Sequence, residues 1–172
     1  MASLKNRMIR AAKLDVHLYE EVEADQGAMA QAMTVVILSA VAAGIGSGNA
    51  GLGGIVIGMI AALIGWYIWA FLTYLIGTKL LPEPETRADY RELLRTIGFS
   101  SAPGLIRVLG IIPGLRVLLF TVASIWMLVA MVIAVRQALD YTSTWRAIGV
   151  CVIGFGVQLL ILLVAIRIGG AL

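Results

Sequence analysis

The chain has 172 residues, of which 60% are hydrophobic and 13% are charged, and its formal net charge is +3. A soluble globular domain is about 45–50% apolar and about 25% charged, so a soluble fold of this length could not bury the excess apolar surface. The basic residues flank long apolar runs and form no continuous stripe, which argues against nucleic-acid binding. The composition therefore predicts an integral membrane protein whose charges lie near the bilayer surfaces.

The sequence carries no pattern typical of a catalytic, cofactor or metal site. The single histidine, His17, is far in sequence from Cys151 and Ser124, so no nucleophile is paired with a base. No P-loop and no H-E-x-x-H motif occurs. Cys151 has no second cysteine to pair with and is expected to be a small buried hydrophobe. We therefore expect a protein that is not an enzyme and that uses no cofactor or metal.

Residues 1–28 precede the first long apolar run and are predicted to form an amphipathic arm at the membrane surface. One helical side of the arm carries Leu4, Met8, Ala11, Leu14, Leu18 and Val22. Basic residues come first and acidic residues last, an order that opposes the helix dipole, so headgroups or a partner are expected to hold the arm. The acidic half is the predicted partner-binding site, and it consists of Glu20, Glu21, Glu23 and Asp25.

The first two membrane spans are predicted at residues 29–46 and 52–80, because no charged residue occurs from Gln26 to Thr78. A glycine-rich hinge at residues 44–54 separates them. Gly54 and Gly58 form a G-x-x-x-G pattern, which favours close packing of membrane helices. The second span ends in aromatic residues that we expect at the headgroup level, namely Trp66, Tyr67, Trp69 and Tyr74.

A polar surface insert at residues 82–98 follows the second span. Its prolines end the preceding helix, and Thr86 with Asp89 resembles a capping box that starts a short amphipathic helix. The helix is expected to lie on the membrane surface, with a solvated loop helix as the alternative. The residues predicted to contact anionic headgroups are Lys79, Arg87, Arg91 and Arg95.

Residues 100–115 contain two Pro-Gly pairs that bracket about ten apolar residues and Arg107. Ten residues are few for a full crossing, so the segment is either a short, kinked span or a re-entrant hairpin supported by protein neighbours. Arg107 is the candidate intramembrane charge, and such a charge indicates a functional site unless it reaches the interface or pairs with Asp140 or with a lipid phosphate.

The last two spans are predicted between Arg116 and Arg136 and between Arg146 and Arg167, because each interval matches one crossing. The penultimate span carries a row of small residues that includes Ala130 and Ala134 and that favours helix packing. Packing within one chain is the simpler interpretation of all these small residues.

Three segments resemble bacterial members of the Yip1 family: LDVHLYEEVEAD (14–25), RELLRTIGFSSAPGLIRVLG (91–110) and WMLVAMVIAVRQALDY (126–141). The resemblance implies a five-helix membrane domain with a cytoplasmic N-terminus. Eukaryotic relatives act in vesicle traffic and bind prenylated GTPases through chains with a long cytosolic N-terminal region, and no signal for that partner occurs here. The resemblance implies no catalytic or ligand-binding residue.

The expected fold is an all-α integral membrane protein of the cytoplasmic membrane. Residues 29–172 form a bundle of about five transmembrane helices, the third short or re-entrant, and amphipathic surface helices accompany it. The expected function is a scaffold or accessory subunit that contacts anionic lipids and another membrane protein or further copies of itself. The alternatives are a small-solute channel or transporter centred on Arg107 and a membrane-shaping protein with its arm and insert wedged into one leaflet.

Overall fold

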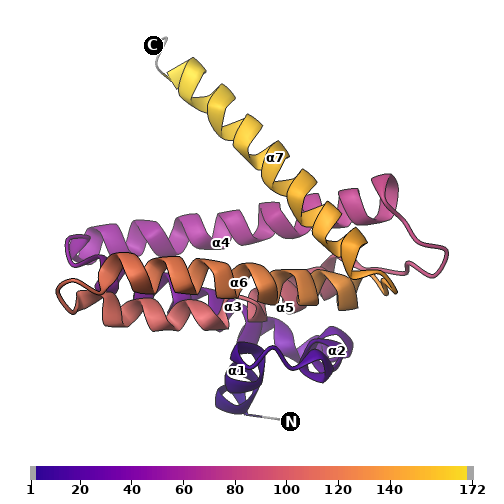
Figure 1. Cartoon of the computed structure of the whole chain (residues 1–172), viewed down its shortest axis with the longest axis horizontal. Coiled ribbons are helices and arrows are strands. Elements are labelled where there is room, and N and C mark those ends of the chain that lie inside the picture. The colour runs from indigo at the N-terminus through magenta and orange to yellow at the C-terminus, as the bar shows by residue number, and fades with distance from the viewer. Residues whose placement is uncertain (1–2, 170–172) are drawn as a thin grey trace.

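The computed structural model describes residues 3–169, and the described chain is helical without a strand. Figure 1 shows a bundle with the N-terminal arm on one side and the last helix leaving on the other. Four helical stretches are long and apolar enough to cross a membrane, namely Gln26–Ser47, Gly51–Leu80, Arg116–Ala138 and Thr144–Ile161. This arrangement confirms the predicted all-α membrane bundle.

Helices α3 (Met29–Ser47) and α4 (Gly51–Leu75) form an antiparallel pair that matches the first two predicted spans. Gly48 ends α3 with φ 73°, and Gly51 has φ 58°, so both positions use the left-handed region that glycine adopts without strain. The turn between them marks what we call the hinge end of the bundle. The opposite end, where α3 begins and α4 finishes, is the arm end.

The arm end of α4 differs from the expected aromatic belt. Trp66 and Trp69 are 5% and 7% exposed, because their rings pack inside the bundle. The Trp66 Nε1 donates to the Leu94 carbonyl at 3.0 Å. These two rings therefore stabilise the packing of helices and do not anchor the chain at headgroups. A π-helical turn, η2 (Ile76–Leu80), then ends the helix before Pro82.

Helix α5 (Tyr90–Phe99) begins with a capping box formed by Asp89 and Glu92, so the expected cap at Thr86 was wrong. The Thr86 hydroxyl instead accepts from the Glu83 N–H in the preceding turn. The apolar face of α5 is buried against protein, and it includes Leu93, Leu94, Ile97 and Phe99. The insert therefore does not lie on the membrane surface as a separate helix, since its apolar side covers neighbouring helices.

Segment η3 (Ala102–Ile111) continues from α5 and runs beside α3 in the same direction. A Cβ added to Gly98 would lie 2.8 Å from the Ala32 Cβ, and one added to Gly46 would overlap the Arg107 carbonyl. The contacts thus progress from the arm end to the hinge end, which excludes a re-entrant hairpin. Because a 3₁₀-helix rises about 2.0 Å per residue, α5 and η3 together extend about 35 Å, enough for a crossing.

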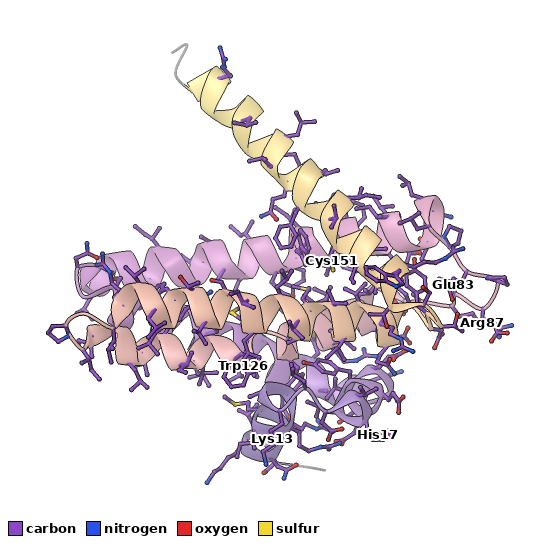
Figure 2. All side chains as sticks on the ribbon, viewed as in Figure 1. Lys13, His17, Glu83, Arg87, Trp126 and Cys151 are labelled. Carbon is purple, nitrogen blue, oxygen red and sulfur yellow. The ribbon has the colours of Figure 1, made fainter. Side chains whose placement is uncertain are left out.

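Helices α6 (Arg116–Ala138) and α7 (Thr144–Gly169) match the last two predicted spans. Helix α6 returns from the hinge end to the arm end, and its Ala130 and Ala134 are fully buried. Helix α7 starts at the arm end, crosses α4 near Cys151 and then leaves the bundle (Figures 1 and 2). Cys151 is 2% exposed, as expected of a small buried hydrophobe.

The arm consists of α1 (Leu4–Ala12), α2 (Val16–Ala24) and the short turn η1 (Gln26–Ala28). It folds back against the side of the bundle (Figure 1). Ala11, Leu18, Tyr19 and Val22 are fully buried there. The Trp126 indole of α6 donates to the Ala12 carbonyl at 2.8 Å. The apolar side of the arm therefore packs on protein.

Candidate functional site

The arm is held together by ion pairs between its two halves. Arg7 is 3% exposed and donates to Glu21, to Asp25 at 2.7 Å and to Gln31 at 3.1 Å. Arg10 pairs with Asp15 and with Glu21. These bonds lower the pKa of Glu21 and of Asp25 below their ordinary values. The basic and acidic halves thus neutralise each other, so the folded arm does not need headgroups for that purpose.

Arg95 joins α5 to the arm. Its Nε donates to the Val22 carbonyl at 2.8 Å and its Nη2 donates to the Glu23 carbonyl. The residue is 5% exposed, which corrects the expectation that it shares an outward basic face with Arg87 and Arg91. Arg87 precedes α5, so only Arg91 and Arg95 share that helix, and the arm covers Arg95 while Arg91 stays exposed.

The connection from α6 to α7 is fixed to the end of α4. The Tyr141 hydroxyl lies 3.0 Å from the Gly77 carbonyl and 2.7 Å from the Leu81 carbonyl, to which it donates. Thr142 donates both its N–H and its hydroxyl to one oxygen of Glu83, at 2.9 and 2.8 Å. Arg146 donates to the Pro82 carbonyl. These bonds place the connection beside the insert, where Figure 2 labels Glu83 and Arg87.

A polar cleft of about 860 Å³ lies between α2, the segment before α5 and the α6–α7 connection. We call it the arm-end cleft, and its lining is Glu20, Glu23, Pro84, Glu85, Arg87, Arg136, Gln137, Asp140, Tyr141 and Thr142. Gln137 fixes one wall by donating to Glu20 at 2.9 Å. Four carboxylates face two arginines, so the cleft has an excess of negative charge.

Glu23 is the most perturbed carboxylate of the cleft. Burial, and after it the nearby Asp140 and Glu92, raise its pKa to about 7, while Arg95 acts in the opposite direction. Each carboxylate added to the cleft makes the next charge more costly. A cation entering the cleft would relieve this repulsion, and among the described residues no group of three or more His, Cys, Asp or Glu side chains could hold a metal ion.

The structure brings some predicted site residues together and separates others. Glu20, Glu23 and Arg87 meet in the arm-end cleft, whereas Glu21 and Asp25 are occupied by the ion pairs of the arm. Lys79 and Arg91 are exposed outside the cleft. The remaining cleft charges are Glu85, Arg136 and Asp140, which sequence reasoning missed because Glu85 lies in the connection before α5 and the other two lie at the end of α6. Their position near helix ends was the available signal.

The predicted packing residues also divide into two groups. Ala130 and Ala134 pack within the chain, but a Cβ added to Gly58 would meet nothing within 4 Å, and one added to Gly54 would meet Ala50 alone. The close approaches that require glycine lie elsewhere, at Gly46 and Gly98, where α3 contacts the α5–η3 segment. Packing within the chain therefore does not explain Gly54 and Gly58.

Arg107 lies on η3 near the hinge end, and its Nη2 donates to the Ser124 hydroxyl at 3.1 Å. Its guanidinium carbon lies 5.6 Å from the centre of the Phe120 ring. Arg107 also lines a cavity of about 270 Å³ whose lining is mostly apolar. Such a lining does not favour a path for hydrophilic solutes, so the channel alternative gains no support from this region.

Comparison with known proteins agrees with this architecture. The family model described as Yip1 domain matches residues 19–166, from α2 to near the end of α7. No curated protein and no solved structure matches the chain. The matched range contains the whole arm-end cleft and the α5–η3 segment. The chain is therefore a multi-pass membrane protein, and it belongs to the Yip1 family.

Proposed function

We propose that the protein is a non-enzymatic scaffold or accessory subunit of a membrane complex. The observation that carries this proposal is the arm-end cleft, because three segments far apart in sequence assemble its polar lining. The cleft has more carboxylates than arginines, so the matching partner segment carries Lys or Arg. Such a segment could be the cytoplasmic tail or loop of another membrane protein, or part of a second copy of this chain.

The arm end is assigned to the cytoplasm in this proposal. Of the 13 Lys and Arg residues, Arg107, Arg116 and Arg167 alone lie outside the arm and the segments 79–95 and 136–146. Short polar segments rich in Lys and Arg stay on the cytoplasmic side of a cell membrane. The exposed Lys79, Arg87 and Arg91 then face anionic headgroups of the inner leaflet, each contributing about 1 kcal/mol of attraction near the surface.

The experiment is purification in native lipid particles from the protein's own membrane, followed by weighing of the intact particles. We expect a companion of fixed stoichiometry. The variant E23Q/E85Q removes two cleft charges whose side chains make no hydrogen bond or ion pair among the described residues, and it should lose most of that companion. A lone chain in the wild-type particles would contradict the scaffold function.

The matched control is E92Q. Glu92 is an acidic residue near the cleft but not part of its lining, and glutamine preserves the capping box at the start of α5. The control should keep the companion at the wild-type level. Equal loss from the control and from E23Q/E85Q would mean that net charge, and not the cleft, determines binding.

A further inference from the structure

The cavity that contains Arg107 lies where α7 crosses α4 and leaves the bundle. Ser39 of α3 forms part of its floor, and Met127 and Met131 of α6 form one wall. Trp69 closes the arm-ward side, since its ring lies 4.5 Å from the Phe155 ring and its Nε1 lies 3.1 Å from the Met131 sulfur. Its volume of about 270 Å³ is small for a ligand site, so the cavity would hold only a part of a ligand.

The charge of Arg107 is not compensated by protein. None of the ion pairs among the described residues includes it. Its Nε is the buried side-chain nitrogen that lacks a hydrogen-bond partner in the described part of the chain. The Ser124 hydroxyl and the Phe120 ring are neutral and leave the positive charge in place. An arginine at this depth therefore favours an anion from its surroundings.

The position of Arg107 relative to the helices matches the geometry of a phospholipid. Ser124 lies eight residues into α6 from Arg116, which is about 12 Å from the hinge end of that helix. The long arginine side chain can reach further toward that surface. A phosphate bound by Arg107 would thus lie at the hinge-side edge of the hydrocarbon. An acyl chain attached to it would extend toward Met127 and Met131, along the mostly apolar cavity.

We propose that this cavity is a binding site for an anionic phospholipid of the hinge-side leaflet, whose phosphate pairs with Arg107 and whose acyl chain occupies the space between α3, α4 and α6. The thioethers of Met127 and Met131 are flexible enough to adjust to a chain of variable shape. The lining of this cavity shares no residue with that of the arm-end cleft, so the site is independent of the scaffold proposal.

The test is native mass spectrometry of the full-length protein after exchange into detergent that contains either phosphatidylglycerol or phosphatidylcholine. Wild-type protein should retain one phosphatidylglycerol and little phosphatidylcholine. R107Q should lower that retention by about tenfold or more, the size expected from removal of one charge-assisted hydrogen-bonded pair. G65L should lower it as well, because a Cβ on Gly65 meets nothing within 4 Å and Gly65 lines the cavity.

Two matched controls separate the site from general effects. R116Q removes the same charge at the same end of the bundle, and Arg116 does not line this cavity. G53L makes the same side-chain change on α4, where an added Cβ also meets open space. Both controls should retain phosphatidylglycerol at the wild-type level. Thermal unfolding in detergent should show R107Q and G65L folded, because Arg107 has no ion pair in the described chain and a Cβ at position 65 meets open space.

Three results would overturn the proposal. The first is equal retention by R107Q and by wild type. The second is loss in both R116Q and R107Q to the same extent, which would show a general charge effect. The third is preferential retention of a free fatty acid, added as oleate, in place of the phospholipid. Because R107Q leaves the arm-end cleft intact, it should keep the companion found in native lipid particles, so failure of the lipid site and failure of the scaffold proposal are distinguishable.

Discussion

At the scale of single residues, glycine determines how closely α3 approaches the α5–η3 segment. Gly46 and Gly98 leave no room for a Cβ, because the Arg107 carbonyl and the Ala32 side chain occupy that space. In lipid no hydrophobic drive brings helices together, so close backbone packing of this kind carries much of the association. The G-x-x-x-G pattern at Gly54 and Gly58 is the more familiar signal, yet it contacts nothing comparable within the chain.

The first prediction compares two Gly→Ala substitutions. G46A should destabilise the protein by about 1–3 kcal/mol, because the new Cβ overlaps a backbone carbonyl that cannot move alone. G58A should be neutral or stabilising by about 0.5–1 kcal/mol, because alanine favours the helix and meets open space. Thermal or denaturant unfolding in detergent measures both. Equal stability of the two variants would contradict the packing described for α3.

Glu23 makes the docking of the arm depend on pH. Its pKa is raised from an ordinary value of 4.5 to about 7, mainly by burial and further by repulsion from Asp140, Glu92 and Glu20, while attraction to Arg95 acts in the opposite direction. The folded arm therefore binds a proton more tightly than the unfolded arm. As a consequence, the stability of the docked arm falls as the pH rises from about 4.5 through 7.

The second prediction follows from this loss of arm stability as the pH rises. Hydrogen-exchange protection factors of α2, corrected for intrinsic rates, should be higher at pH 5.5 than at pH 8, conditions that straddle the pKa of Glu23, which is about 7. E23Q should remove most of this difference and protect α2 more strongly at pH 8. If protection of α2 in E23Q fell between pH 5.5 and pH 8 by as much as in the wild type, another group would be responsible.

Glu21 and Asp25 contribute with the opposite sign. Hydrogen bonds from Arg10 and from Arg7 lower their pKa values, so the stability that they provide is present above their ordinary pKa and is lost as the pH falls through the lowered one. The docked arm should therefore be most stable at mildly acidic pH, between the two transitions.

At the scale of elements, Arg7 is the central residue of the ion-pair cluster that holds the arm together. Its guanidinium is almost fully buried, while its carboxylate partners Glu21 and Asp25 are 33% and 24% exposed. The arm therefore folds as two helices held by charge across a single turn. The left-handed residue Leu14, with φ 62°, makes that turn.

The third prediction concerns this ion-pair cluster. R7Q should weaken arm docking by about 1–3 kcal/mol, because two carboxylates and Gln31 lose a partner and the carboxylates remain partly solvated. The control K5Q changes an exposed lysine of the same helix and should stay within about 0.5 kcal/mol. Limited proteolysis of the arm measures both. Similar cleavage of R7Q and wild type would contradict the role of Arg7.

Amphipathic patterns located these elements but could not identify what covers them. Leu18 and Val22 of the arm and Leu93 and Ile97 of the insert were expected to face lipid, and all four face protein. A helix with an apolar face gains similarly from either environment, because lipid tails and buried side chains are both apolar. The choice depends on contacts between residues far apart in sequence, such as Arg95 with Val22.

At the scale of the whole molecule, charge intervals and glycines were sufficient to predict the four long apolar helices. The span boundaries agree within a residue or two at Met29, Gly51 and Arg116. The α5–η3 segment, the third expected span, could not be predicted in the same way. Its length depends on the rise per residue of a 3₁₀-helix, which residue spacing does not reveal. Three residues of the arm-end cleft were singled out from the sequence, Glu20 and Glu23 for a partner and Arg87 for headgroups, but the cleft itself was not predicted, because its other half comes from the end of α6 and the α6–α7 connection.

The central claim is that the arm-end cleft binds a partner segment, and a photo-cross-linking amino acid placed at position 85 in the native membrane tests it most directly. Glu85 is exposed and lines the cleft, and Asn49 at the hinge end is the exposed control position. We predict one discrete product from position 85, with a basic segment of the partner at the linkage and with loss of the product in E23Q. No product from position 85, or the same products from position 49, would contradict the claim.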